Sequence, residues 1–148
     1  MLIAPARAAP YTWDGGGGNN NASTPANWVG DAAPSAGDDI ILDATTNKDM
    51  TWDAAAPSSV ASWTQVGYTG AVTFATVYGA SGFTNFEITG NCVVSNGTWT
   101  HPANAGAEVS RLRVAVGGTF EIGPAGRIDV TGRGYGSSSG PGKGVGAL

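Results

Sequence analysis

Short segments in which apolar and polar residues alternate recur along the chain, and each predicts a β-strand. The clearest is 111–116, where three apolar side chains share one face and two arginines occupy the other. Gly, Asn or Pro residues bound these segments, as they do where strands end in tight turns. Strands are expected at 39–43, 60–66, 71–77, 83–88, 92–94, 111–116, 119–122 and 127–130.

Two copies of one short sequence favour a particular arrangement of these strands. Phe-Glu-Ile occurs at 86–88 and again at 120–122, a spacing of 34 residues. A repeat of this length with Gly and Asn at the corners is typical of a β-solenoid, in which each coil stacks on the last. We therefore predict an all-β fold, a short parallel β-solenoid. A β-sandwich is the alternative, because it also places a strand every ~8–12 residues.

Composition agrees with this fold and divides the chain into segments. Gly contributes 24 of the 148 residues and charged residues only 12%, which disfavours helices. No apolar run reaches the ~20 residues of a membrane helix, so membrane insertion is not expected. The expected segments are a signal-peptide remnant or flexible terminus (1–8), an aromatic-rich N-terminal cap or β module (9–58), solenoid coils (59–131) and a Gly-rich loop or linker (132–148).

The far end of the coils lacks a recognisable cap. A solenoid needs capped ends to avoid edge-to-edge aggregation. The Gly-rich residues that follow the last predicted strand cannot build such a cap. We therefore expect the open end either to continue into a longer protein or to be covered by a partner.

Charge is unevenly distributed over a net value of −4. Residues 1–74 carry seven acidic and two basic side chains, and residues 75–148 carry four acidic and five basic ones. The acidic front argues against nucleic acid as a partner, because phosphate binding needs clustered Lys and Arg. An acidic head and a more basic tail would favour head-to-tail contact between copies of the chain; a solvated surface is the alternative.

Cys92 is the only cysteine, so no disulfide can form within the chain. Its setting between Asn91 and Val93 suits a small buried hydrophobe. A nucleophilic role would need a base nearby, for which His101, the sole histidine, is the one candidate.

Five tryptophans are many for this length, and they allow two interpretations. Buried, Trp13, Trp28 and Trp52 would plug the N-terminal end of the solenoid. Exposed on one face, tryptophans would stack on sugar rings and make glycans a partner. The plug is the favoured interpretation.

Three carboxylates form the candidate metal site. Asp38, Asp39 and Asp43 lie in one short segment, and Ca²⁺ prefers several oxygen ligands from a loop. The spacing matches neither an EF-hand loop nor an RTX-type nonapeptide repeat. The alternative is a turn at Asp38 followed by strand positions that face solvent. No other cofactor is expected.

Arg111 and Arg113 are the remaining candidates for chemistry or assembly. With Glu121 and Asp129 on adjacent coils they would supply the base and carboxylates of a polysaccharide lyase. Ion pairs between coils on a solvated face account for the same residues.

Several of these segments together resemble the N-terminal module of large, repetitive bacterial secreted and surface proteins. In those proteins, of the autotransporter-passenger or adhesin type, the module precedes right-handed parallel β-helix coils. The segments that carry the resemblance are 13–18 (WDGGGG), 25–28 (PANW), 37–43 (GDDIILD), 60–64 (VASWT), 118–120 (GTF) and 126–132 (GRIDVTG). The resemblance implies a secreted or cell-surface location and a scaffold, adhesive or matrix role, and it carries over no functional residue.

The expected function is structural and non-catalytic. We expect an extracellular or cell-surface subunit that assembles into filaments or a matrix with copies of itself or with adjacent surface-protein segments. A carbohydrate-binding adhesin module is the first alternative, and a fragment of a β-helical polysaccharide lyase is the second.

Overall fold

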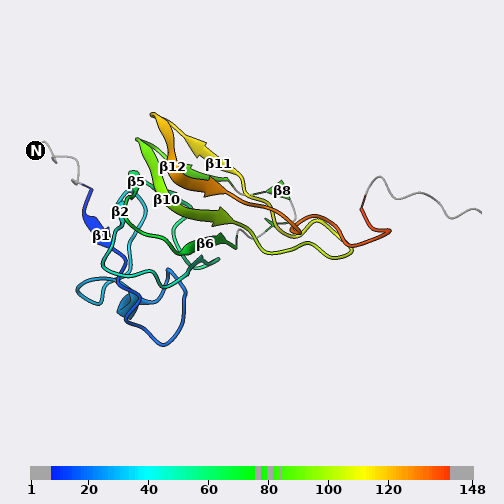
Figure 1. Ribbon diagram of the computed structural model, residues 1–148. Helices are drawn as coiled ribbons and strands as arrows, with labels where there is room; N and C mark the ends of the chain where they lie inside the picture. Colours follow the sequence, from blue (N-terminus) through cyan, green and yellow to red (C-terminus); the bar gives the residue numbers. More distant parts are fainter. Residues whose placement is uncertain (1–7, 76–77, 80–81, 84, 141–148) are drawn as a thin grey trace, which may run out of the picture.

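Parallel pairing between strands far apart in the sequence dominates the computed structural model, which describes residues 8–75, 78–79, 82–83 and 85–140 (Figure 1). Among the described strand pairs only the hairpin of β7 (Tyr78–Gly79) and β8 (Gly82–Phe83) is antiparallel. The chain winds into a β-solenoid of about four turns. This confirms the predicted solenoid over the sandwich, which would need antiparallel sheets.

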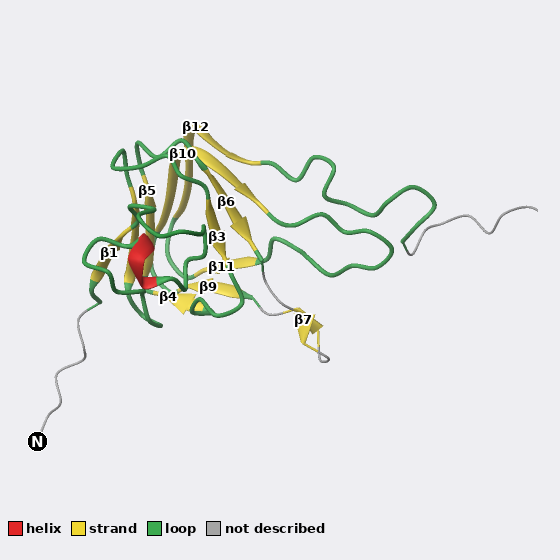
Figure 2. Ribbon diagram, turned by 90° about the horizontal axis from the view of Figure 1, so that it is seen from below, coloured by secondary structure: helices red, strands yellow, loops and turns green. Residues whose placement is uncertain are grey.

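Three stacks of strands surround a common interior (Figure 2). The first contains β1 (Pro10–Thr12), β2 (Asp39–Leu42), β5 (Ser62–Gln65) and the first halves of β10 (Cys92–Thr100) and β12 (Phe120–Ile128). The second contains β3 (Met50–Trp52), β6 (Ala71–Phe74) and the second halves of β10 and β12. The third contains β4 (Ser59–Val60), β9 (Phe86–Ile88) and β11 (Val114–Val116), and a single turn of 3-10 helix, η1, covers Pro25–Asn27.

The coil length differs from the 34-residue repeat in the sequence. Hydrogen bonds between equivalent positions on successive coils join residues 29, 23, 29 and 28 apart. Phe120 pairs with Cys92 in the first stack, whereas Phe86 pairs with Val114 in the third. The two Phe-Glu-Ile copies therefore occupy different sides of the solenoid. Their similarity reflects the inward–outward–inward alternation of a β-strand, which strands such as β3 and β9 show in their burial.

Two strands are longer than the sequence predicted because they continue around a corner. β10 extends from the predicted 92–94 to Thr100, and the segments 119–122 and 127–130 join into β12. Gly97 allows the bend in β10, since its φ of +77° is a conformation that few other residues adopt. Before β11 the reverse occurs: the predicted strand 111–116 begins only at Val114.

A column of aromatic rings fills the interior. Trp52, Trp63 and Trp99 lie on three successive coils, with ring centroids 5.3 Å and 5.5 Å apart. Two phenylalanines of the second and third stacks pack against this column. Gln65 is a fully buried polar residue beside this column, and its Oε1 accepts from the Nε1 atoms of both Trp63 and Trp99.

The N-terminal end of the solenoid is closed. Trp13 and Trp28 pack edge to face with centroids 5.3 Å apart, and both are fully buried. Lys48 holds the glycine loop over them, because its Nζ donates to the carbonyl oxygens of Gly15 and Gly17. A backbone bridge between residues 21 and 51 covers the edge of β3.

The expected division of the chain stays a prediction. Residues 9–58 contain β1, β2 and β3, which belong to the same sheet as the later strands. Residues 1–7 of the expected signal-peptide remnant, and 141–148 of the Gly-rich segment, lie outside the described residues. The part of the chain that the structure describes holds no helix with the length and hydrophobicity for crossing a membrane.

Candidate functional site

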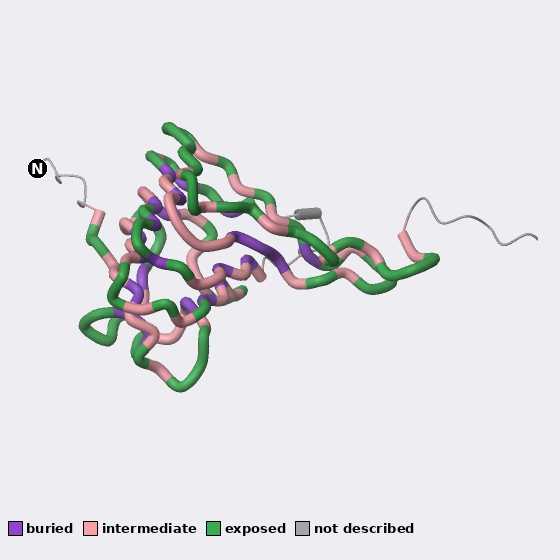
Figure 3. The backbone as a smooth tube through the Cα atoms, viewed as in Figure 1, coloured by how far each residue is buried: buried purple, intermediate pink, exposed green. Residues whose placement is uncertain are grey.

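The outer edge of the last coil is open. β12 pairs with β10 on one side, and no strand within the described ranges pairs with its other side. The apolar side chains that should face the interior of this coil remain 43–46% exposed; they are Phe120, Ile122, Ile128 and Val130. Their partners one coil below on β10, Cys92, Val94 and Trp99, are at most 1% exposed. Figure 3 shows this contrast between β10 and β12.

A cavity of about 410 Å³ opens at this end of the solenoid. Its lining is mostly apolar and comes from β11, from β12 and from Trp99 of the coil below. The polar residues of the lining are His101 and Arg111. An apolar hollow edged by polar groups suits contact with an apolar protein surface better than a small polar ligand.

The aromatic column of the core ends in this opening. Phe120 stacks on Trp99, with ring centroids 5.9 Å apart and planes at 21°. Each lower ring of the column is covered by the next coil, but Phe120 has nothing above it among the described residues. The column therefore presents its last ring to solvent, where burial would release water from apolar surface.

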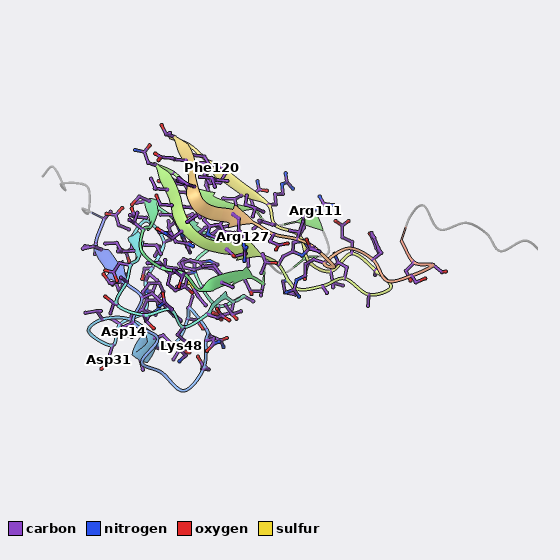
Figure 4. The ribbon with its side chains drawn as sticks, in the orientation of Figure 1. Asp14, Asp31, Lys48, Arg111, Phe120 and Arg127 are labelled. Carbon is purple, nitrogen blue, oxygen red and sulfur yellow. The ribbon has the colours of Figure 1, made fainter. Side chains whose placement is uncertain are left out.

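Charged side chains flank the opening along β12. Glu121 and Arg127 are both exposed, one on each side of the bend, and the Arg127 Nε donates to the Oγ1 of Thr98 on β10. Just beyond β12, the backbone N–H and the hydroxyl of Thr131 hold the pKa of Asp129 below its usual range. The rim thus carries both signs of charge. Figure 4 shows Phe120 and Arg127 on β12, with Asp14 and Lys48 at the opposite end.

The tryptophans that sequence reasoning assigned to packing are all inside the molecule. Trp13 and Trp28 are fully buried and Trp52 is 3% exposed. Trp13 and Trp28 close the N-terminal end, whereas Trp52 belongs to the central column. All five tryptophans are buried, so none offers a free ring face for a sugar.

The three candidate calcium ligands bind different backbone and side-chain groups. Asp38 accepts from the backbone N–H groups of residues 9 and 35, Asp39 from the Ser62 hydroxyl, and Asp43 from the Thr45 N–H. Hydrogen bonds from Thr45 lower the pKa of Asp43. Within the described residues no three acidic, His or Cys side chains gather to hold a metal ion. Asp38 and Asp39 therefore tie neighbouring coils together, and Asp43 stabilises the turn that follows β2.

The two candidate catalytic arginines contact different parts of the chain. Arg111 binds Glu108 three residues earlier, with its Nη2 2.6 Å from the carboxylate Oε1. Arg113 precedes β11, and its carbonyl accepts from Phe86. Burial raises the pKa of the Cys92 thiol to about 12, which keeps it protonated at neutral pH and unsuited to nucleophilic attack.

The fold and its two unlike ends define a class: a short parallel β-solenoid that is closed at its start and, among the residues that the structure describes, open at the outer edge of β12. Comparison of the chain with protein-family models, with curated proteins and with solved structures finds no significant match. What the chain does must therefore be argued from the open end itself.

Sequence reasoning predicted an open end, but it did not predict which apolar residues would be exposed there. Alternation predicts that Phe120 and Ile122 share one face of their strand and that Ile128 and Val130 continue it. The same pattern describes Ile40 and Leu42, which are fully buried. Exposure depends on whether another coil lies above, and no local pattern contains that information.

Proposed function

We propose that this chain is a structural, non-catalytic scaffold subunit that assembles through the open end of its last coil. One observation carries the proposal: the inward-facing apolar residues of β12 remain nearly half exposed around an apolar cavity. Contiguous apolar surface of this kind marks an interaction site in a soluble protein. An unpaired strand edge beside it adds backbone groups that are ready to pair.

The closed N-terminal end supports the same function. A solenoid module that only had to be stable would be closed at both ends, because each open end exposes apolar surface and a strand edge. Here Trp13, Trp28 and Lys48 complete one end, and nothing in the described chain completes the other. A one-sided opening directs association to a single surface.

An extracellular or cell-surface setting belongs to the proposal. Its support is the resemblance of segments such as 13–18 and 37–43 to the start of large bacterial surface proteins. A closed first coil followed by an open one is the geometry that such an N-terminal module would need. The scaffold would then act outside the cell.

Sedimentation velocity of the full chain over a range of concentrations tests the proposal. We expect self-association of the wild type, and we expect Ile122→Lys to raise the dissociation constant about tenfold or more, because it places a charge among the exposed apolar side chains of β12. Val66→Lys is the matched control. Val66 is 48% exposed and Ile122 45%, but Val66 lies at a corner after β5, away from the opening.

The two variants give a clear decision. An equal effect of Ile122→Lys and Val66→Lys would mean that association does not use the open end. A wild type that remains monomeric up to about 100 µM would contradict assembly as its function. Circular dichroism of each variant checks that the solenoid is intact.

A further inference from the structure

We propose that the open end is covered by the open end of a second copy, so that two chains form a two-fold symmetric dimer in which β12 pairs antiparallel with its counterpart. This inference rests on the proposed function, because it names the partner and the orientation of the same surface. It replaces head-to-tail contact with end-to-end contact between identical surfaces.

The unlike ends of the solenoid favour this orientation. Head-to-tail stacking would place the apolar opening against β1, a strand of three residues that begins with Pro10. A short edge strand with proline is a poor template for pairing, and the tryptophan cap behind it leaves no apolar opening. The one described surface with a matching apolar opening is the open end of another copy.

The sequence of β12 complements itself when it is reversed. In an antiparallel pair centred on Pro124, Phe120 of one copy lies opposite Ile128 of the other. In the same register Glu121 lies opposite Arg127, and symmetry produces each contact twice. Opposite charges and apolar side chains placed directly across two strands both stabilise a sheet. A parallel strand in any register would not bring these pairs together symmetrically.

Backbone N–H and C=O groups at the outer edge of β12 are available to pair with the same strand of a second copy. At its two ends the Thr119 carbonyl accepts from Cys92 and the Asp129 N–H donates to Trp99, so these positions face β10. Successive residues direct their backbone groups to opposite edges of a strand, so Phe120, Ile122 and Ile128 direct theirs outward. Pro124 lies at the bend, where the pairing with β10 is already interrupted. The missing N–H of proline therefore removes no bond from either arm of the strand.

Charge reversal in separate chains tests the register. We expect Glu121→Arg and Arg127→Glu each to raise the dimer dissociation constant about tenfold or more, because each places like charges opposite one another twice. In an equimolar mixture of E121R and R127E, each variant repels itself but complements the other. Native mass spectrometry should then detect the heterodimer at wild-type affinity.

A cysteine at the symmetry axis tests the orientation independently. Position 124 faces its own counterpart only in a two-fold contact, so Pro124→Cys should form a disulfide-linked dimer on mild oxidation. Val66→Cys is the exposed control and should not cross-link efficiently. The native Cys92 is fully buried and does not interfere.

Glu87→Arg is the matched control for charge reversal. Glu87 is exposed in the same Phe-Glu-Ile sequence as Glu121, but it lies on β9 in the third stack. The Glu87→Arg substitution should leave the dimer dissociation constant unchanged. An effect as large as that of Glu121→Arg would overturn the assignment of the charge to the interface.

The outcomes separate this inference from the proposed function. If the wild type associates and Ile122→Lys weakens it, but the mixture forms no heterodimer and P124C does not cross-link, the open end binds in another orientation and the two-fold dimer is wrong. If the wild type is monomeric, the proposed function fails as well. Heterodimer rescue together with cross-linking at position 124 would support the two-fold dimer.

Discussion

A single buried amide links successive coils in the interior of this protein. Gln65 is fully buried, and its Oε1 lies 3.3 Å from the Nε1 of Trp63 and 2.9 Å from that of Trp99. Its Nε2 donates to the carbonyl of Asn96 at 2.6 Å. Large indole rings can be stacked in a narrow core only if their N–H groups find acceptors. The Oε1 of Gln65 is the acceptor for both Trp63 and Trp99.

Replacing Gln65 should therefore lower the free energy of unfolding far more than the size of its side chain suggests. We expect Gln65→Leu to lower the free energy of unfolding by about 2–4 kcal/mol, because two indole N–H groups and one carbonyl lose their buried partners. Urea denaturation followed by tryptophan fluorescence measures the change. Thr64→Leu, an exposed position on the same strand, should change it by less than about 0.5 kcal/mol. Equal effects of the two substitutions would show that the amide network contributes nothing.

At the scale of the element, β12 is held to β10 by close backbone approach. A Cβ atom at Gly126 would overlap the carbonyl oxygen of Val94, and the two strands run side by side at that point. Backbone on both sides cannot move aside as a flexible side chain would. Only glycine at position 126 lets the second half of β12, residues 125–128, lie in register with β10.

Gly126→Ala should detach this arm without unfolding the lower coils. We expect a loss of about 1–3 kcal/mol, with faster hydrogen exchange concentrated in residues 120–128. Because the open end is built from these residues, association should weaken in parallel. Gly106→Ala is the control, since a Cβ there meets nothing within 4 Å. Unchanged exchange in β12 of the Gly126 variant would contradict this account of the pairing.

At the scale of the whole molecule, stability should depend on pH in the alkaline range. Burial raises the pKa of Cys92 from 9.0 to about 12. Burial, together with the charge of Asp49, also raises the pKa of Tyr68 above its usual range. Both groups stay neutral in the folded chain, whereas the unfolded chain ionises them at their ordinary pKa values. The contribution of these two groups to the free energy of unfolding is therefore complete below pH 9. It declines as the pH rises toward the pKa values of the folded chain.

We expect the free energy of unfolding to fall between pH 9 and 11, and Cys92→Ala to make that fall shallower. The difference in slope should reach about 1 kcal/mol per pH unit above 9. Urea titrations at several pH values measure it, with the value at pH 7 as the internal reference. Parallel pH profiles of the wild type and C92A would contradict the raised pKa.

Much of the local structure could be predicted because its signals lie in neighbouring residues. Period-2 alternation predicts one shared face for Ile40 and Leu42 and another for Leu112, Val114 and Val116; in the structure the first two are fully buried and the other three pack against the core. Turn residues between short strands favoured an all-β solenoid, and the structure has one. These inferences hold because the direction of a side chain from a strand is set by the residues beside it.

Local alternation along the chain therefore decides which residues face inward, whereas contacts between coils decide which of those residues are covered. The 34-residue repeat suggested a stacking register that the 28- and 29-residue coils do not follow. Cys92 and Phe120 share the same inward pattern, yet one is buried and the other exposed. Coil register and the last coil's exposure depend on strands distant in sequence, and a local pattern carries no record of those contacts.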